Sequence, residues 1–354
     1  MSSTWAMPAE TTPHDATWMA WPSGSYTLGE TAAEAEAARR TWADVANAVA
    51  EWEPVHLLVP PSERAEARRL LGAGVTCHEV PLDDAWYRDI GPTFVVDTDD
   101  AGERRLGAVN WTFNGWGQQS WATWEHDAVA SLVATEASGA VRIDSAMVNE
   151  GGGIHTDGAG TFLVTESVQL DPGRNPGWTR AQVQAELAHT VGARELVWLE
   201  RGLTRDHERY GTRGHVDIVA TFADRGVLLV HDQRDPAHPD HAITRDVAAT
   251  LAEARDADGK PLDVLALPAP AVLRDEEGWV DYSYVNHYVC NGAVIACSFA
   301  DPHDAEARDV LADAYPGRHV VQIDARPLFA RGGGIHCITQ QQPCLSADVP
   351  EGSR

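Results

Sequence analysis

Five short polar clusters along the chain carry the side chains whose types and spacing could do chemistry. Together they hold one thiol, several histidines and several carboxylates, and they stand near the starts of strand-like segments. A thiol accompanied by histidine and carboxylates is typical of a nucleophilic cysteine that works with a histidine acid and base. The clusters are WYRD at 86–89, NE at 149–150, GHVD at 214–217, YVNH at 284–287 and IHC at 335–337.

Each cluster also has a purely structural interpretation. Asp89 could form a surface ion pair with the arginine before it, and Glu150 could be a turn or cap residue before its glycine run. His215 and Asp217 stand two apart on an expected strand, where they would face the same side and could share a structural hydrogen bond. Cys337, in an expected apolar strand, could be an inert core thiol. Their joint occurrence favours a site.

The number of carboxylates near the thiol narrows the range of possible substrates. Acidic groups beside a thiolate raise the pKa of the thiol and weaken the nucleophile unless a cation occupies the site. A guanidinium ion resolves this conflict, because its planar fork donates paired N–H groups to two carboxylates and its charge favours the thiolate that attacks its carbon. The residues therefore favour the deimination of a guanidino compound.

An internal repeat indicates how the clusters are brought together. The pentapeptide GGGIH occurs at 151–155 and again at 332–336, and we expect each copy to open a strand-like segment. Segments along the chain share one order: a short strand, a glycine turn, a second strand, then a helix and a further strand. Roughly five such units would close on themselves, as radially repeated sheets do. We expect an α/β fold, a ring of ββαβ-type modules whose polar strand tips meet at a central cleft, in one domain over 1–354.

Hydrophobic periodicity places the elements of these modules. The predicted helices cover 30–52, 62–71, 121–138, 179–190, 240–255 and 302–315. The predicted strands cover 55–59, 75–80, 93–96, 107–113, 141–143, 161–165, 196–199 and 226–231.

Composition limits the function classes. The 354 residues include 27 Lys+Arg and 53 Asp+Glu, so the net charge is −26, which disfavours nucleic-acid binding and favours a small cationic ligand. No apolar run is long enough to cross a bilayer and no secretory leader is visible, so we expect a cytoplasmic protein without membrane contact. Five cysteines without CxxC spacing, and the lack of HExxH, predict neither disulfides nor a metal site. The four cysteines expected to be structural are Cys77, Cys290, Cys297 and Cys344.

Eight blocks, in order from residue 7 to residue 343, resemble the agmatine deiminase family. The resemblance implies a five-bladed, pseudo-symmetric α/β propeller, the pentein fold. It also implies the hydrolysis of agmatine to N-carbamoylputrescine and ammonia without metal or organic cofactor, and a homo-oligomer. The blocks are MPAETTPHDATWMAWPS (7–23), WYRDIGPTFVV (86–96), NWTFNGWG (110–117), EGGGIHTDGAGT (150–161), LDPGRNPG (170–177), RGHVD (213–217), YVNHYVCNGAVI (284–295) and GGGIHCITQQQP (332–343).

The resemblance also implies roles for matching positions. Cys337 is the expected nucleophile that forms a thiouronium intermediate, and His215 is the general acid and base. Asp89 and Asp217 are expected to bind the guanidinium, and Glu150 to help hold it and orient the histidine. The pocket walls are expected from Trp86 and Trp116, and a close approach of backbone to substrate from the glycines Gly332, Gly333 and Gly334.

Three positions depart from the family pattern: Arg213, Ile218 and the pair Gln118–Gln119. Arg213 could read a substrate carboxylate or pair with Asp206 or Glu208. These departures leave two alternatives open. One is a deiminase of free or peptidyl arginine or another guanidine, and the other is a non-catalytic guanidinium-binding protein.

Overall fold

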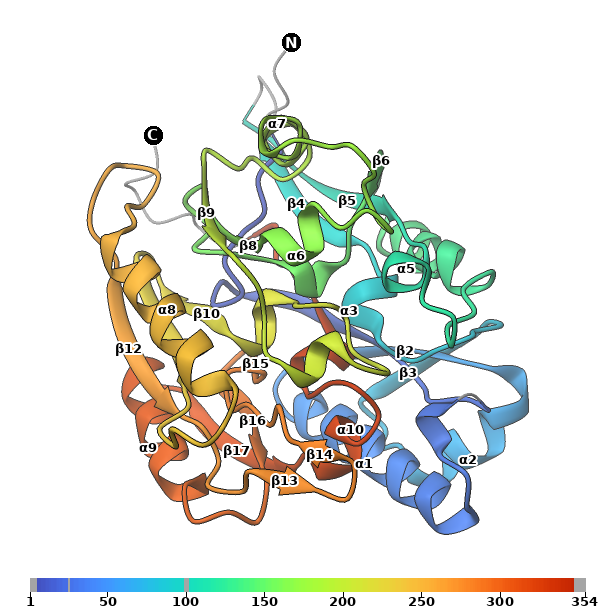
Figure 1. The fold of residues 1–354 in the computed structure, drawn as a ribbon. Coiled ribbons are helices and arrows are strands. Elements are labelled where there is room, and N and C mark those ends of the chain that lie inside the picture. The colour runs from blue at the N-terminus through green and yellow to red at the C-terminus, as the bar shows by residue number, and fades with distance from the viewer. Residues whose placement is uncertain (1–4, 25, 99–101, 347–354) are drawn as a thin grey trace.

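The strands of the chain form several separate sheets in a mixed α/β arrangement (Figure 1). The computed structural model describes residues 5–24, 26–98 and 102–346. Four sheets have three strands each, and in each of them the first strand is antiparallel to the second and the second is parallel to the third. The four sheets are β4 (Thr93–Thr98), β5 (Arg104–Thr112) and β6 (Val141–Val148); β7 (Ile154–Thr156), β8 (Thr161–Thr165) and β9 (Glu195–Leu199); β10 (Ala220–Asp224), β11 (Val227–Asp232) and β12 (Asp263–Pro268); and β15 (Tyr288–Cys290), β16 (Ala293–Ser298) and β17 (His319–Asp324).

A four-stranded sheet joins the two ends of the chain. The last strand, β18 (Thr339–Pro343), is antiparallel to the first, β1 (His14–Ala20), which is parallel to β2 (Val55–Val59). β3 (Val75–Glu79) extends the sheet in parallel. The strand order β18-β1-β2 therefore repeats the pattern of the other sheets, and a short hairpin of β13 (Arg274–Asp275) and β14 (Gly278–Trp279) stands apart.

Helices connect the second strand of each unit to the parallel third, as a parallel crossover requires. In Figure 1, α8 and α9 lie at the left of the molecule and α2 and α5 at the right. Two of the helices begin with capping boxes, Thr31 with Glu34 and Thr179 with Gln182, which satisfy the first backbone N–H groups. The longer helices are α1 (Ala32–Ala50), α2 (Arg64–Leu70), α5 (Ala130–Ser138), α7 (Arg180–Thr190), α8 (Asp240–Glu253) and α9 (Asp304–Ala314).

Short helical turns stand just before β4, β7, β10 and β18. They contact one another: α3 (Tyr87–Ile90) touches η4 (Gly151–Gly153) and η7 (His336–Ile338), and η4 touches η6 (Val216–Ile218). The polar clusters of the sequence lie on or beside these turns. The fold therefore brings together residues that are far apart in the chain. The remaining short turns are η1 (Tyr26–Leu28), η2 (Pro61–Glu63), α4 (Gly115–Gln118), η3 (Asp127–Val129), α6 (Glu166–Gln169), η5 (Arg205–His207) and α10 (Arg326–Phe329).

Apolar side chains between the helices and the sheets form the core. The largest cluster holds Trp42, Leu57, Tyr288 and Cys297, all buried, and two smaller clusters centre on Phe222 and Phe162. The inner strands are rich in Val, Leu and Ile because sheets covered by helices are buried on both faces.

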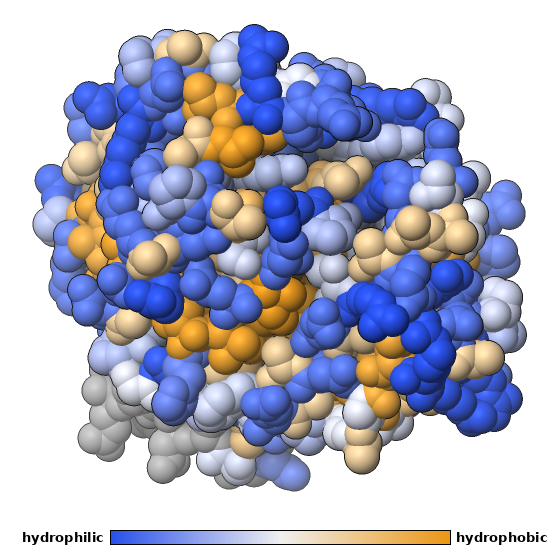
Figure 2. Space-filling view, turned by 90° about the horizontal axis from the view of Figure 1, so that it is seen from below, coloured by the Kyte–Doolittle hydropathy of each residue, from blue (hydrophilic) through white to orange (hydrophobic). Residues whose placement is uncertain are grey.

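The outer surface is largely hydrophilic. Figure 2 shows blue, hydrophilic residues over most of the lower face, with hydrophobic residues in separate small groups. Among the described residues, the exposed large hydrophobic side chains are Val129 and Val141. Within the same ranges, no helix is both long and apolar enough to span a bilayer.

Most predicted elements match the structure to within a few residues at each end. The predicted helix over 121–138 is wrong in its first half, because α5 starts at Ala130 after the turn η3. Trp121 is instead used in tertiary packing, stacked on Trp116 at 5.3 Å and edge-on to Tyr210. No strand was predicted at β1 (His14–Ala20).

Leu57→Ala should destabilise the protein by about 2–5 kcal/mol, because it opens a cavity in the largest core cluster. Val141→Ala is the control, since the Val141 side chain is 46% exposed and should change the free energy of unfolding by less than about 0.5 kcal/mol. Urea denaturation followed by circular dichroism measures both, and equal stabilities would contradict the placement of β2 in the core.

Candidate active site

The thiol of Cys337 lies in the turn η7, at the base of a pocket that opens between aromatic rings. Its sulfur is 3.3 Å from Asn286 Nδ2, which can donate a hydrogen bond to it, and its S–H can donate to Asp217 Oδ2 at 3.6 Å. The expectation of an apolar strand at this position was wrong, because the second GGGIH copy leads into η7 and the strand β18 begins only at Thr339. The thiol lines the pocket and also belongs to the largest apolar cluster.

Burial and the nearby carboxylates raise the pKa of Cys337 well above its ordinary value. The two carboxylates that act on it most strongly are Asp217 and Asp89. The resting group is therefore a thiol. A cation bound between these carboxylates would offset their charge and favour the thiolate.

One ring nitrogen of His215 is hydrogen-bonded to a carboxylate, and the other has no hydrogen-bond partner. Its Nε2 bonds Glu150 Oε2 at 3.2 Å, while Nδ1 is buried without a hydrogen-bond partner, 3.8 Å from Asp89 Oδ1. Burial lowers the pKa of His215, but the carboxylates of Asp89 and Glu150 outweigh it and raise the pKa to about 9. The imidazole is protonated at neutral pH and has one ring nitrogen available for proton transfer.

The predicted strand over His215 and Asp217 was wrong, because both belong to the segment that enters η6. The side chains still converge: a Cβ at Gly152 would lie 2.6 Å from His215 Nδ1 and 3.1 Å from Asp217 Oδ2. His215 and Asp217 lie close together because of the turn η6, and not because they alternate along a strand.

Glu150 is held in place by a buried arginine. Arg174 Nε lies 3.0 Å from both oxygens of Glu150, its Nη1 donates to Asp171 Oδ2 at 2.9 Å, and its Nη2 donates to the Thr212 carbonyl at 2.7 Å. Burial raises the pKa of Glu150, but Arg174 and His215 together hold it below its ordinary value. The interpretation of Glu150 as a cap is wrong, since its side chain makes no capping bond.

Asp89 faces the pocket with both oxygens oriented by donors. Trp116 Nε1 donates to Oδ2 at 2.9 Å, and the backbone N–H of Gly152 donates to Oδ1 at 3.1 Å. Burial raises the pKa of Asp89 to about 6. Asp89 forms no surface ion pair with Arg88, because both are buried and Arg88 bonds Glu10 at 3.2 Å.

Asp217 has one occupied and one free oxygen. Oδ2 lies 2.8 Å from His336 Nδ1, whereas Oδ1 is buried without a hydrogen-bond partner. Burial raises the pKa of Asp217, but His336 more than offsets this, and the pKa stays below its ordinary value. An ionised carboxylate oxygen without a donor, beside the thiol, is a site for the N–H group of a cationic ligand.

Aromatic rings wall the pocket. Trp86 and Trp116 line it, as predicted, and Trp86 Nε1 donates to the hydroxyl of Tyr26 at 2.8 Å. Tyr26 in turn stacks on Tyr210 with ring centroids 4.4 Å apart. The rings that line the pocket are Tyr26, Trp86, Trp116, Trp121 and Tyr210.

Trp116 has a left-handed backbone, with φ of 53° and ψ of 48°, which a side chain of its size rarely adopts. A conformation of this kind costs about 1–3 kcal/mol and persists where the surroundings enforce it. Here the Gly117 N–H donates to Asn114 Oδ1 at 2.9 Å and closes the turn. The strained turn aims the Trp116 indole N–H at Asp89.

The glycines of the last block lie in different surroundings. A Cβ at Gly333 would lie 2.7 Å from the Trp86 ring and 3.0 Å from Cys337 Sγ, so Gly333 borders the thiol. Gly332 lines the pocket with a φ of +107°, which favours glycine. A Cβ at Gly334 would meet Asn286 and the Phe329 ring, so this glycine allows close packing behind the pocket.

The three unusual positions have structural roles. Arg213 bonds Asp171, with Nη1 to Oδ2 at 2.9 Å, and the expected partners Asp206 and Glu208 were wrong. Asp206 is instead occupied by the backbone N–H groups of 212, 214 and 215. Ile218 is buried in an apolar cluster, and Gln118 and Gln119 donate to backbone carbonyls of neighbouring loops.

Sequence reasoning missed several residues that hold the site. Asn286 stands in one of the polar clusters but had no role, and its amide contacts the thiol. Arg174 and Asp171 occur in the block LDPGRNPG, and Glu10 in the block MPAE. A search for buried charges within these blocks could have found them, since a buried carboxylate needs a cationic or hydrogen-bonding partner.

The remaining cysteines divide into two pairs. Cys290 and Cys297 are buried core thiols, as expected, whereas Cys77 is exposed and Cys344 is partly exposed. All are free thiols. The structural assignment therefore fits the first pair and is wrong for Cys77, which packs in no core.

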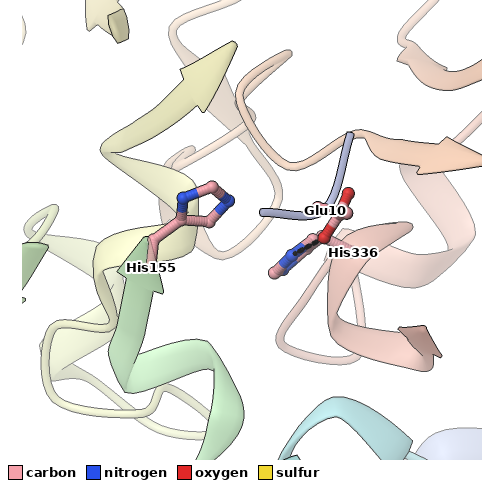
Figure 3. A group of neighbouring side chains, drawn as sticks. All are labelled: Glu10, His155 and His336. Atoms are coloured by element: carbon pink, nitrogen blue, oxygen red, sulfur yellow. Dashed lines mark hydrogen bonds and ion pairs between the residues drawn. The ribbon is translucent and has the colours of Figure 1, made fainter. Parts of the chain in front are cut away.

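One group in the described part of the chain has donors spaced for a metal ion. Ligand atoms of Glu10, His155 and His336 lie within 4.8 Å of one another (Figure 3). The ring nitrogens are already bonded, however: those of His155 to Thr221 and the Phe222 N–H, and those of His336 to Asp217 and Glu10. A bound metal ion would break several of these bonds, next to the guanidinium of Arg88. The geometry therefore favours a hydrogen-bond network over a metal site.

Arg174→Met should destabilise the protein by about 3–5 kcal/mol, because it leaves the Glu150 carboxylate buried without its cation. Arg180→Met is the matched control: its ion pair with Glu166 is exposed and contributes at most about 1 kcal/mol. Guanidinium chloride denaturation measures both variants. Equal losses would show that the buried pair does not matter more than a surface one.

Comparisons with known proteins show which family the chain resembles over nearly its whole length. A provisionally named agmatine deiminase of Streptomyces avermitilis is 52% identical over 339 residues, which cover 95% of this chain and 96% of that protein. An agmatine deiminase of Stutzerimonas stutzeri is 37% identical, with 95% of each chain covered. The solved structure of the Enterococcus faecalis agmatine deiminase matches with a TM-score of 0.88 at 28% identity and covers 96% of both chains. The model of the Porphyromonas-type peptidyl-arginine deiminase family matches residues 6–343, and the chain belongs to that family.

Proposed function

We propose that the protein hydrolyses agmatine to N-carbamoylputrescine and ammonia, with Cys337 as the nucleophile. The observation that carries the proposal is the convergence of Asp89, His215 and Asp217 on this thiol in a buried pocket, with His215 Nδ1 and Asp217 Oδ1 left without partners. The relatives named agmatine deiminase, at up to 52% identity, support the same substrate.

The charges around the pocket support agmatine over arginine. A substrate α-carboxylate would need a cation, and three arginines around the site already bond carboxylates: Arg88 bonds Glu10, and Arg174 and Arg213 bond Asp171. The rings at the pocket suit an uncharged aliphatic chain and a terminal ammonium, which the faces of Trp and Tyr attract. The pocket therefore fits a guanidine with a cationic or neutral tail.

Catalysis begins when the substrate guanidinium sits between Asp89 and Asp217. Its charge lowers the pKa of Cys337, the thiol proton passes to water, and the resulting thiolate attacks the guanidinium carbon to form a C–S bond. His215, already protonated, gives its proton to the departing amine, so that ammonia leaves and an S-alkylthiouronium remains.

In the second half, neutral His215 takes a proton from water, and the oxygen attacks the same carbon. The C–S bond breaks, the thiolate is restored and a urea product is released. Glu150 holds Nε2 of the imidazole throughout, and the Asn286 amide can donate to the anionic sulfur. Every proton thus moves through His215 or water.

We also propose that the sheets form the five-bladed ring of the pentein fold. The repeated strand order in all five sheets supports it, as does the position of the site residues before the first strand of each unit. We also propose that the protein is cytoplasmic and forms a homo-oligomer. The free thiols fit a reducing compartment.

The test is ammonia release from agmatine, arginine and a peptidyl-arginine ester, assayed side by side. We expect turnover of agmatine, and a loss of at least about 10³-fold in kcat for Cys337→Ala because the nucleophile is gone. The variant should still bind agmatine, as isothermal titration would show. A preference for arginine would mean that arginine, and not agmatine, is the substrate. Full activity of Cys337→Ala would contradict the role of Cys337 as the nucleophile.

The pH dependence follows from two groups of the free enzyme. Asp89, with a pKa of about 6, must be ionised to bind the guanidinium, so kcat/KM should fall as the pH drops through about 6. His215, with a pKa of about 9, must be protonated to release ammonia, so kcat/KM should fall above about 9. In Asp89→Asn the acidic limb should vanish, together with most of the activity. Undiminished kcat/KM at pH 5, with circular dichroism showing a folded protein, would contradict the assignment.

A further inference from the structure

His336 is adjacent to the nucleophile in sequence, but its ring bonds two carboxylates behind the pocket. Nδ1 lies 2.8 Å from Asp217 Oδ2 and Nε2 lies 3.0 Å from Glu10 Oε2. Ionised carboxylates only accept hydrogen bonds, so both ring nitrogens must donate. A histidine with two donating nitrogens is an imidazolium cation.

Glu10 is fixed independently of the histidine. Its Oε1 accepts the backbone N–H of Val289 at 2.8 Å, and its Oε2 lies 3.2 Å from Arg88 Nη2. Arg88 is anchored by Gln341 at 2.8 Å and by the His336 carbonyl at 3.3 Å. The Glu10 carboxylate is therefore held by several bonds where it supports the ring of His336; Figure 3 shows these two side chains joined by a dashed line, with His155 across from them.

The charges that face His336 favour its protonated form. Burial and the Arg88 guanidinium lower its pKa, but the carboxylates of Glu10 and Asp217 outweigh them and raise it. The other titratable rings packed nearby are neutral, since burial lowers the pKa of His155 to about 3 and that of His287 to about 4. The imidazolium thus has two anionic neighbours and one cationic neighbour.

The repeated pentapeptide provides an internal contrast. His155 and His336 end the two GGGIH copies, and their rings lie 5.9 Å apart. His155 accepts the Phe222 N–H at Nδ1, so Nε2 carries the proton that it donates to Thr221. One copy therefore holds a neutral histidine, and the other holds a cation beside the nucleophile.

We propose that His336, supported by Glu10, is a positioning residue that keeps Asp217 ionised and turned so that Oδ1 faces the substrate guanidinium. This inference rests on the proposed function. Without the imidazolium, Asp217 would lose its closest donor in a buried site, and its freed carboxylate could rotate toward the thiol. The nucleophile and the guanidinium-binding carboxylate are thereby coupled through adjacent residues of η7.

Two substitutions separate the two bonds of the ring. His336→Asn keeps an amide N–H near the position of Nδ1, which can still reach Asp217, whereas His336→Gln keeps one near Nε2, which can reach only Glu10. We expect His336→Gln to raise KM for agmatine and to lower kcat/KM by about 10²-fold, as a misplaced binding group does. His336→Asn should lose clearly less. His287→Asn, a buried histidine that bonds Tyr284 and Tyr315, is the control and should keep the wild-type KM.

The pH profile of Glu10→Gln distinguishes positioning from general support of the fold. Removal of the Glu10 charge should lower the pKa of His336, so His336 should lose its proton at a lower pH than in the wild type. If this pKa falls below that of His215, loss of the His336 proton should lower kcat/KM before His215 titrates, so the alkaline fall should begin at a lower pH than the wild-type fall set by His215. A loss that is equal at every pH, or Asn and Gln variants with equal kcat/KM, would overturn the inference.

A readout without turnover separates this inference from the proposed function. In ¹⁵N-histidine NMR of the unliganded protein, the signal absent from His336→Asn should show both ring nitrogens protonated at pH 7. A neutral His336 would overturn the positioning role even if agmatine is turned over. If the wild type releases no ammonia from agmatine, the proposed function fails, while the NMR result still decides the charge of His336.

Discussion

The whole site depends on the confinement of many carboxylates in a small, buried volume. Unpaired buried charges are costly, and each of these carboxylates is matched by a cation or by backbone donors. The Arg174 guanidinium bonds Glu150 and Asp171, and that of Arg88 bonds Glu10. The imidazolium of His215 bonds Glu150, and that of His336 bonds Asp217. The thiol stands at the centre of this array, and one free carboxylate oxygen is left for a cationic substrate.

The architecture provides this arrangement by placing a short turn before the first strand of each unit. Each of the turns α3, η4, η6 and η7 is followed by a strand and contacts at least one of the other turns. Catalytic groups carried on rigid elements keep their geometry better than groups on long loops. Even the strained backbone of Trp116 is closed by a bond to Asn114.

Sequence patterns predicted the units well because apolar periodicity and glycine turns are local signals. The repeat of GGGIH indicated several related modules, and the polar residues at their starts indicated convergence. The local assignment of His215 and Cys337 to strands failed, since a turn of three residues has no periodicity to detect. Tertiary packing of Trp121 likewise overrode the helical pattern of residues 121–126.

Partners of buried charges were the hardest to foresee. Arg213 has acidic residues close in sequence, but it bonds Asp171, which is 42 positions away. Glu10 and His336 are separated by 326 positions. Only the tertiary arrangement of the units decides such pairs, and no pattern within one unit contains that information.

The sheet that unites both ends of the chain gives the protein an order of assembly. Among the described strands β1 comes first along the chain and β18 last, and Cys337, the proposed nucleophile, lies in the turn directly before β18. Asp89, Glu150 and His215 are all synthesised before the thiol that they surround. The set of proposed catalytic groups is therefore complete only when the segment that carries Cys337 and β18 is in place beside β1.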